Sequence, residues 1–344
     1  MRIGIDLMGG DHPPKLLYPA LLQIAKHFSS SQSLLVIGTK DVADQLDSFF
    51  HSSLDQNIQD RIAIEICKET VDMTDDPLSA VRLKKNSSMA IGMRLLKTKA
   101  IDAFITCGNT GALIASAAII LPMFPNLSHP ALLISLPTET GMVAVLDAGG
   151  NIFNHAEDLV QFAFLGASYQ RILRGIEMPK VGLLNIGVES RKGTVEVRKA
   201  YGMLERYCQE VTLKGDPLPF HFSGNIEGRD LFKGTVDVLV TDGFTGNVLL
   251  KTAEGVAAFI FESLQANIKG EFAGDCAQAF VELKKQFNYT EYPGAILCGV
   301  EGLVVKLHGN ATAESLYKSI LNTVECLEKQ LINRLRTCLK SSIG

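Results

Sequence analysis

The chain has 344 residues, of which 47% are hydrophobic and 20% are charged, as in globular proteins of one large domain or two intimate ones. A net charge of −4 and a pI near 6.0 argue against bulk nucleic-acid binding. Seven scattered cysteines form no Cys-x-x-Cys pair and seven histidines lack metal-ligand spacing, so we expect no metal site and no disulfide framework. Asp6 comes too early for a signal peptide, and the longest apolar run, 112–124, is too short to span a bilayer. We therefore expect a cytoplasmic protein.

The first strand is expected at 2–7, and a turn with two glycines and two prolines follows it directly. Ligands bind at the carboxyl ends of strands in open α/β sheets, so Asp6, Gly9 and Gly10 are candidate binding residues. Helical spacing at 16–28 precedes a second strand at 34–37.

Asp75-Asp76-Pro77 is a strong helix start, with an acidic N-cap before a proline. This helix carries a basic cluster, Arg82, Lys84 and Lys85, shortly before the first Gly-rich turn. The cluster is either a solvated helix face or a binding surface for phosphate or an acidic partner.

The segment 101–113, IDAFITCGNTGAL, predicts a strand, a turn at Gly108-Asn109-Thr110-Gly111, and a helix. Its continuation, 112–121, is apolar on all sides, so we expect that helix to be buried.

The stretch 235–254, TVDVLVTDGFTGNVLLKTAE, repeats this pattern. A buried strand is followed by a turn at Asp242-Gly243-Phe244-Thr245-Gly246, and helical spacing resumes at Asn247. Free N–H groups at the start of such a helix favour an anion, and we expect Lys251, one turn inside, to lean back toward it. The two turns either face one shared cleft or are the ordinary reuse of one unit in a parallel sheet.

Further strands are expected at 142–146, 181–186 and 295–306, with an outer strand at 220–225 and a helical hairpin at 256–287. Polar residues follow two of these strands: Asn185 and Lys192 after one, His308 after another. Alternating strands and helices predict an α/β fold with a largely parallel sheet. Since no composition shift marks a boundary, we expect 1–344 to form one catalytic domain with the hairpin as an excursion.

No dinucleotide fingerprint, P-loop, zinc-protease or nucleophile-elbow motif is present. Another set of motifs spans nearly the whole chain: MRIGIDLMGGDHPP, DDPLSAVRLKKNSSM, CGNTGAL, VGLLNIGVESRKG, GNIEGRDLFKGTVDVLVTDGFTGNVLLKTAEG, EYPGA and VKLHG. Together they resemble the bacterial phosphate acyltransferases of phospholipid synthesis. The chain departs from that family at Val188, at Ala148 and Gly150, at Pro293 and Ile296, and at Cys107, where the family has a small residue.

The resemblance implies transfer of a fatty acyl group from acyl carrier protein to inorganic phosphate. It also implies a homodimer, no metal or other cofactor, and a three-layer Rossmann-like sandwich related to isopropylmalate dehydrogenase and phosphate acetyltransferase. The product, an acyl phosphate, is expected to be consumed by a membrane-bound glycerol-3-phosphate acyltransferase. The hairpin tip then touches either the inner face of the membrane or the dimer partner.

This chemistry suits the residues. Phosphate and acyl-group binding is assigned to the residues of the strand-end turns: Asp6, Gly9, Gly10, Gly108, Thr110, Gly111, Asn185, Asp242, Gly243, Phe244 and Gly246. Positioning the phosphate and stabilising the oxyanion require donors and positive charge, and the candidates are Asn109, Lys192, Asn247, Lys251 and His308. The basic cluster Arg82, Lys84 and Lys85 is the candidate docking surface for the acidic carrier.

Two alternatives belong to other classes. A metal- and NAD-dependent decarboxylating dehydrogenase of related fold would bind both cofactors. A non-catalytic scaffold at the membrane would tolerate loss of Asn109 or Lys251. Neither explains the complete motif set as well as an acyltransferase does.

Overall fold

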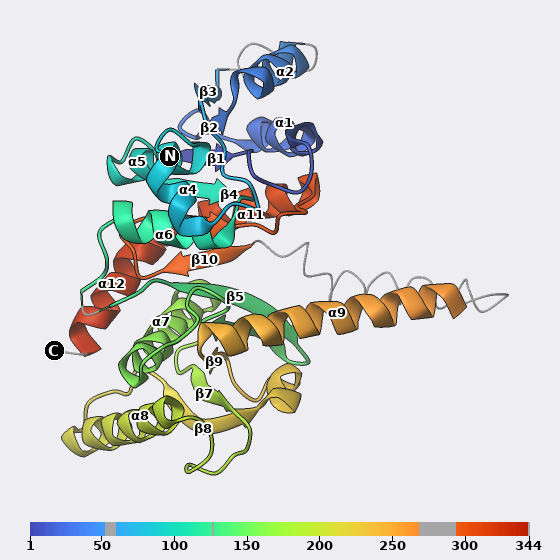
Figure 1. The fold of residues 1–344 in the computed structure, drawn as a ribbon. Coiled ribbons are helices and arrows are strands. Elements are labelled where there is room, and N and C mark those ends of the chain that lie inside the picture. The colour runs from blue at the N-terminus through green and yellow to red at the C-terminus, as the bar shows by residue number, and fades with distance from the viewer. Residues whose placement is uncertain (52–59, 126, 268–293, 343–344) are drawn as a thin grey trace. The chain divides into compact units, whose positions relative to one another are not determined.

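The computed structural model describes residues 1–51, 60–125, 127–267 and 294–342. Contacts between residues divide the chain into two compact units, Met1–Leu132 with Pro293–Gly344, and Leu133–Tyr292. We refer to them as unit 1 and unit 2 (Figure 1). The amino-acid composition does not change at the boundaries between the two units, because both are built from buried strands and covering helices.

Unit 1 carries its strands in the order β3-β2-β1-β4-β11-β10, all parallel except β10. Its elements are β1 (Arg2–Asp6), η1 (Pro14–Leu17), α1 (Tyr18–His27), β2 (Ser33–Gly38), α2 (Lys40–His51), β3 (Ile62–Ile66), α4 (Pro77–Leu83), α5 (Ser88–Lys97), β4 (Ala103–Thr106), α6 (Thr110–Ile120), β10 (Ala295–Cys298), β11 (Leu303–Lys306), α11 (Ala313–Glu328) and α12 (Leu331–Ser342).

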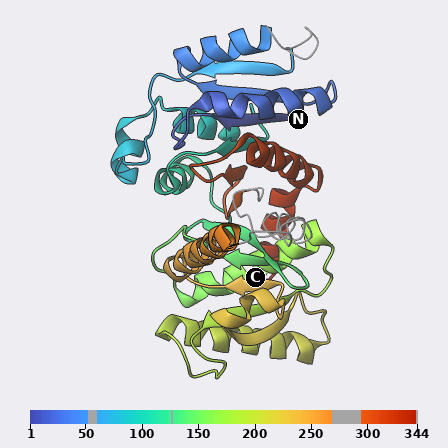
Figure 2. The same cartoon turned by 90° about the vertical axis from the view of Figure 1, so that its right-hand side faces the viewer.

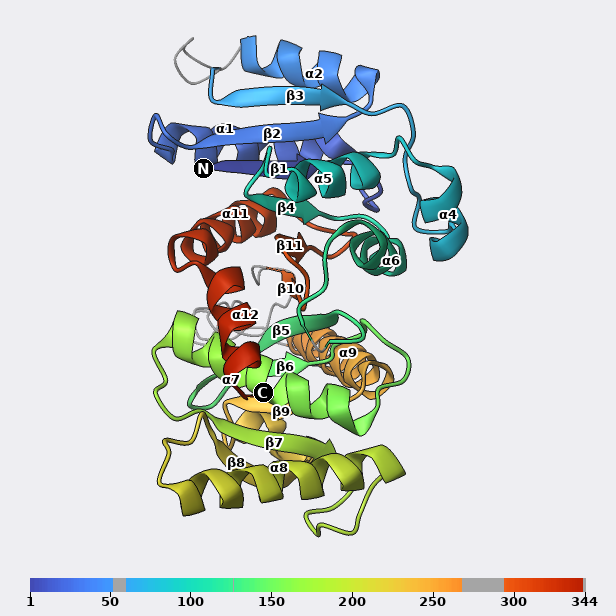
Figure 3. The same cartoon turned by 90° about the vertical axis from the view of Figure 1, so that its left-hand side faces the viewer.

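Helices cover both faces of the unit 1 sheet. Helices α1, α2 and α11 pack on one face, and Figure 2 shows α1 beside α11. Helix α5 lies on the other face against β1, β2 and β4, and α6 and α4 follow it (Figure 3). Central strands β1, β4 and β11 are apolar on both faces, because each face is covered by helices. Edge strand β3 is only half buried.

Unit 2 has the strand order β5-β6-β9-β7-β8, with β5 and β6 antiparallel and the remaining neighbours parallel. Its elements are β5 (Ala131–Thr138), β6 (Gly141–Leu146), α7 (Ala156–Arg174), β7 (Lys180–Asn185), α8 (Val195–Lys214), β8 (His221–Glu227), η2 (Gly228–Lys233), β9 (Val238–Val240) and α9 (Gly243–Asn267). Helix α7 packs on β6, β9 and β7, and α8 packs beside it (Figure 3). Strand β8 is at the edge, as the sequence predicts for its outer strand.

The repeated strand, turn and helix are confirmed in both units, as β4 to α6 and β9 to α9. The two copies of this repeat also share an equivalent hydrogen bond from an aspartate to a neighbouring strand. The Asp102 carboxylate accepts the N–H of Arg2 at 2.7 Å, and the Asp237 carboxylate accepts the N–H of Lys180 at 2.7 Å. Each aspartate thus aligns its own strand with the start of a neighbouring strand.

Four features of the structure differ from the sequence predictions. Strand β5 is missed from the sequence, and 295–306 forms an antiparallel pair, β10 and β11, instead of one strand. Helix α9 begins at Gly243 rather than at Asn247. Helix α6 is not buried on all sides, since Ile119 is 64% exposed; only one side packs on α4 and α5.

Most of the expected hairpin lies outside the described residues, and only its first part, within α9, is described. Over the described ranges, no helix has both the length and the apolar character needed to cross a bilayer.

Packing of α5 on β4 depends on a glycine. A Cβ at Gly92 would lie 2.0 Å from Cε2 of Phe104, which is fully buried. In Gly92→Ala, overpacking costs about 1–3 kcal/mol and the better helix propensity of alanine returns ~1 kcal/mol, so the free energy of unfolding should fall by up to about 2 kcal/mol. Urea unfolding measures the change. Gly202→Ala in α8 is the matched control, because no atom lies within 4 Å of its Cβ, and it should stabilise the protein by about 0.5–1 kcal/mol. Equal shifts of both variants would contradict the packing argument.

Candidate active site

A row of three polar side chains crosses the carboxyl end of the unit 1 sheet. Asp6, Thr106 and Lys306 end β1, β4 and β11 and are paired in register. All three are buried, Asp6 with 1% of its surface exposed and Lys306 with 7%. The Thr106 hydroxyl donates to the Asp6 carboxylate at 2.9 Å, and that carboxylate also accepts the N–H of Met8 at 2.9 Å. The row fixes the start of the loops that follow β1, β4 and β11.

These loops contact one another through glycines. The N–H of Asp11 donates to the carbonyl of Gly309 at 2.7 Å. Gly9 has a left-handed φ of 75°, and a Cβ there would lie 2.6 Å from the carbonyl oxygen of Val71. A larger residue would push the loops apart, so Gly9 has a packing role at this edge.

Asn109 is the N-cap of α6. Its Oδ1 accepts the N–H of Ala112 at 3.0 Å, and its Nδ2 donates to the carbonyls of Asp72, Met73 and Asp75 at 3.2–3.4 Å. Both ends of the amide are therefore engaged. Asn109 holds the 72–75 loop against the helix start.

The start of α6 keeps open backbone donors. The N–H of Gly108 donates to Thr106 and that of Ala112 to Asn109, whereas the described residues supply no acceptor for the N–H groups of Thr110 and Gly111. These two donors and the positive end of the helix dipole favour an anion. The structure thus keeps Gly108, Thr110 and Gly111 together at one polar edge with Asp6.

Unit 2 has a different polar centre at the carboxyl end of β6. The buried Asp147 carboxylate accepts the N–H groups of Gly149, Gly150 and Asn151 at 3.2, 2.8 and 2.8 Å, and the side-chain amide of Asn151 at 2.8 Å. A nest of N–H groups of this kind binds anions, and here the protein's own carboxylate fills it.

At the start of α9, too, the protein's own side chains accept backbone N–H groups. The Asp242 carboxylate accepts both the N–H and the hydroxyl of Thr245 at 2.8 Å, and Asn154 Oδ1 accepts the N–H of Gly243 at 3.2 Å. Asp242 is therefore an N-cap, and this explains why the helix begins at Gly243. A carboxylate at this position disfavours a second anion beside Gly243 and Gly246, so the two turns are not equivalent.

Lys251 does not lean back toward the turn as expected. Its ammonium pairs with Glu254 at 2.7 Å, toward the carboxyl end of α9. A carboxylate one turn ahead attracts the ammonium more than the capped turn behind it does. Asn247 is exposed and lies against Gly149, and Phe244 is 63% exposed.

Asn185 shapes the loop that follows β7. Its Nδ2 donates to the carbonyl of Lys192 at 3.1 Å, and its Oδ1 accepts the N–H of Ile186 at 2.8 Å. Asn225 ties the same loop to β8 through the carbonyl of Glu189 at 2.8 Å. The Lys192 side chain is left exposed on this ordered loop.

The basic cluster is divided by the fold. Lys84 is half buried and its ammonium binds the Asp75 carboxylate at 2.5 Å and the carbonyl of Thr70 at 2.8 Å. Arg82 and Lys85 are exposed. Lys84 therefore fixes the 70–75 loop, and only Arg82 and Lys85 remain accessible to a partner.

His308 lies on the loop after β11, where its carbonyl accepts the N–H of Ala311 at 3.1 Å. Within the described ranges, no group of three or more His, Cys, Asp or Glu residues is arranged to hold a metal ion.

Four polar residues of these centres are not among the candidates predicted from the sequence: Thr106, Asp147, Asn154 and Lys306. The available signal is position, because three of them stand at or just after the end of an apolar strand, where a polar side chain faces the ligand edge. Asn154 has no such signal. It is buried, and its Nδ2 has no hydrogen-bond partner in the described part of the chain.

Burial raises the pKa of Asp6 from 3.8 to about 6, against the opposing effects of its hydrogen bonds and of Lys306. A carboxyl whose pKa is higher in the folded state stabilises the fold below the unfolded pKa and loses this contribution as the pH rises through the folded pKa. Between pH 4 and pH 7 the unfolding free energy of the wild type should therefore fall relative to that of Asp6→Asn, by up to about 3 kcal/mol. Urea unfolding of both proteins across this range tests it, and parallel profiles would contradict a raised pKa.

Comparison with known proteins agrees with this architecture. The family model described as "Fatty acid synthesis protein" matches residues 1–334. Curated relatives named "Phosphate acyltransferase" include one from Chlamydia pneumoniae, 40% identical over 97% of this chain and 98% of the relative. Another, from Thermoanaerobacter pseudethanolicus, is 35% identical over 99% of this chain and 98% of the relative.

Solved structures show the same fold. A phosphotransacetylase from Streptococcus pyogenes has a TM-score of 0.59 at 16% identity and covers 99% of this chain and 94% of its own. The EutD phosphotransacetylase from Staphylococcus aureus has a TM-score of 0.56 at 14% identity, with coverage of 98% and 94%. Because the family model and the relatives both span nearly the whole chain, this protein belongs to the phosphate acyltransferase family.

Proposed function

We propose that this acyltransferase moves a fatty acyl group from acyl carrier protein to inorganic phosphate, giving an acyl phosphate for phospholipid synthesis. The observation that carries the proposal is the start of α6, where the N–H groups of Thr110 and Gly111 have no acceptor among the described residues, beside the buried Asp6–Thr106–Lys306 row. A small anion suits this place, because helix N–H groups can bind its oxygens in a poorly hydrated setting.

The start of α9 supports the assignment by contrast. Asn154 and Asp242 already accept the N–H groups of Gly243 and Thr245, and the Asp242 carboxylate opposes a second anion there, so we assign phosphate to the first turn. Unit 2 then supplies groups for the acyl donor. Asn247 and Lys192 have exposed side chains at its strand ends and are the candidates for stabilising the thioester oxyanion.

The proposed reaction is direct attack by phosphate on the thioester carbonyl. A phosphate oxygen forms the new bond to carbon, the carbon–sulfur bond breaks, and the thiol leaves as a thiolate. A free thiol has a pKa near about 8.5, so little proton donation is needed.

Cys107 is a poor alternative nucleophile. It is buried, and burial raises the pKa of its thiol to about 12, so the reactive thiolate is scarce at neutral pH. This supports a route without an acyl-enzyme.

The protein should release acyl phosphate from acyl carrier protein thioester only when phosphate is present, as measured by thiol release and by trapping the product with hydroxylamine. Cys107→Ala should retain the activity within about twofold, because direct attack gives that thiol no role. Acylated protein that accumulates without phosphate, and is lost in Cys107→Ala, would overturn direct attack. Thiol release independent of phosphate would overturn the proposed function.

The same assay tests carrier docking. Exposed Arg82 and Lys85 suit an acidic carrier, and the double charge reversal should raise the Michaelis constant for the carrier several-fold at low salt. Lys26→Glu, an exposed change elsewhere in unit 1, is the control, and an unchanged constant would remove this surface from the proposal.

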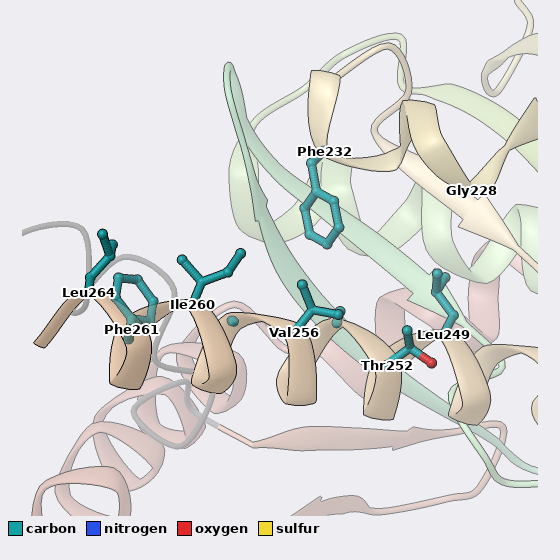
Figure 4. Close-up of a pocket in the computed structure, with 10 residues that line it drawn as sticks. Gly228, Phe232, Leu249, Thr252, Val256, Ile260, Phe261 and Leu264 are labelled. Carbon is teal, nitrogen blue, oxygen red and sulfur yellow. The ribbon is translucent and has the colours of Figure 1, made fainter. Parts of the chain in front are cut away.

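A homodimer is also proposed, and helix α9 supports it. Its side chains line a groove of about 480 Å³ with Phe232 of η2, and Val256, Ile260 and Leu264 point into the groove (Figure 4). On another side of the helix, Phe259 is 69% exposed. Burying each such side chain against a partner contributes about 1.5–3 kcal/mol.

Phe259→Glu with Ile260→Glu should convert the dimer to the 37.3 kDa monomer at micromolar concentration, since two carboxylates would be buried in an apolar contact. Sedimentation velocity measures the change. Gln265→Glu, on an exposed position of the same helix, is the control and should leave the dimer intact. A wild-type protein that sediments only as a monomer would contradict the proposal.

A further inference from the structure

Helix α4 turns its two leucines toward solvent. Leu78 is 56% exposed and Leu83 is 78% exposed, although the helix has only seven residues. The less exposed positions recur every three or four residues and share the opposite side of the helix: Pro77, Ala80, Val81 and Lys84. This is the reverse of an ordinary surface helix, whose large apolar side chains face the core. Two leucines on one exposed side indicate a contact with a partner.

The helix is held firmly beside the start of α6, on which it packs (Figure 3). A Cβ at Gly111 would lie 2.7 Å from Cγ of Pro77, so the first turns of the two helices are in close contact. The loop before α4 is fixed by the Asn109 amide and by the ion pair of Lys84 with Asp75. A partner that binds α4 is therefore held next to the N–H groups assigned to phosphate.

Basic side chains surround Leu83. Arg82 precedes it and Lys85 follows it closely, and both are exposed. The guanidinium of Arg94, on exposed α5 surface, donates to the carbonyl of Lys85 at 2.6 Å. Three basic groups thus gather at the carboxyl end of α4.

Nearby carboxylates offset this charge only in part. Glu69 accepts a backbone N–H of the loop after α4 at 2.8 Å. Asp75 is paired with Lys84, and Asp76 caps the first turn of α4, at the opposite end of the helix from Leu83. The exposed surface around Leu83 is therefore both apolar and net positive. Such a surface suits a partner that presents acidic and apolar groups side by side.

We propose that Leu78 and Leu83 are the apolar anchors through which α4 binds the acyl carrier protein, with Arg82 and Lys85 beside them. The inference rests on the proposed function for the identity of the partner. The carrier is acidic, and its thioester has to reach a phosphate at the start of α6, to which α4 is attached. The basic groups steer the carrier toward the helix, and the leucines hold it there, because burial of apolar surface does not depend on charge and is not screened by salt.

The double variant Leu78→Ser with Leu83→Ser keeps the charges and removes the anchors. Its dissociation constant for acyl carrier protein without an acyl group, measured by fluorescence anisotropy of the labelled carrier, should rise by about tenfold. The rise should be the same at low and at moderate salt, whereas the effect of reversing Arg82 and Lys85 should shrink as salt is added. Leu213→Ser, which removes an 87% exposed leucine from α8, is the matched control and should leave the constant unchanged.

An unchanged dissociation constant in the folded double variant would overturn the proposal, as would a wild-type protein that does not bind the carrier. Circular dichroism measures folding, and Leu78→Ala with Leu83→Ala replaces the serine variant under the same criteria if that variant does not fold. Sedimentation velocity tests a second copy of this chain as the occupant of α4. A double variant that is monomeric where the wild type is dimeric would also overturn the proposal.

Carrier binding separates this inference from the proposed function, because it requires no reaction. A wild-type protein that binds the carrier through the two leucines but forms no acyl phosphate would refute the proposed reaction and leave the docking surface standing. In the acyl transfer assay, the double variant should raise the Michaelis constant for the acyl carrier and keep turnover at saturation within about twofold. An active wild type whose double variant keeps the wild-type Michaelis constant would refute the docking surface alone.

Discussion

The register of β1, β4 and β11 is the constraint on which the candidate site depends. Because Asp6, Thr106 and Lys306 are paired across these strands, their side chains meet at one edge of the sheet, and the loops that follow begin from fixed positions. A slip of one of these strands by one residue would turn its polar side chain to the opposite face, against the covering helices there. The buried row therefore requires the correct pairing, and the pairing in turn places Gly9 against Gly108 and Gly10 against Gly309.

Burying an acid and a base in this row is costly, and hydrogen bonds offset the cost. The Asp6 carboxylate is held by Met8 and Thr106, and the Lys306 ammonium by two carbonyls. The pKa of Asp6 still rises, so the hydrogen bonds do not fully replace water.

Local patterns in the sequence predict much of this fold. Asp76-Pro77 predicts the start of α4, and the apolar runs predict β1, β2, β6, β7 and β9 within one or two residues. The pairing of Lys84 with Asp75 depends on how one helix meets one loop, and the partners of Asn109 come from residues 34–37 positions away. Such contacts are set by tertiary packing. For that reason the sequence identifies which turns are polar but not which of their groups are already engaged.

The two Gly-rich turns, before α6 and before α9, are similar in sequence but differ in which of their N–H groups are engaged. Aligned residue by residue, Thr106, Gly108, Thr110 and Gly111 match Thr241, Gly243, Thr245 and Gly246, yet α6 begins at Thr110 and α9 begins two positions earlier, at Gly243. The cap decides both the register and the charge. Asn109 caps α6 with a neutral amide and leaves the N–H groups of Thr110 and Gly111 open, whereas Asp242 caps α9 with a carboxylate that fills the place of an anion. A neutral cap is compatible with a bound phosphate and a charged cap opposes it, so the same strand, turn and helix favour an anion in unit 1 and disfavour one in unit 2.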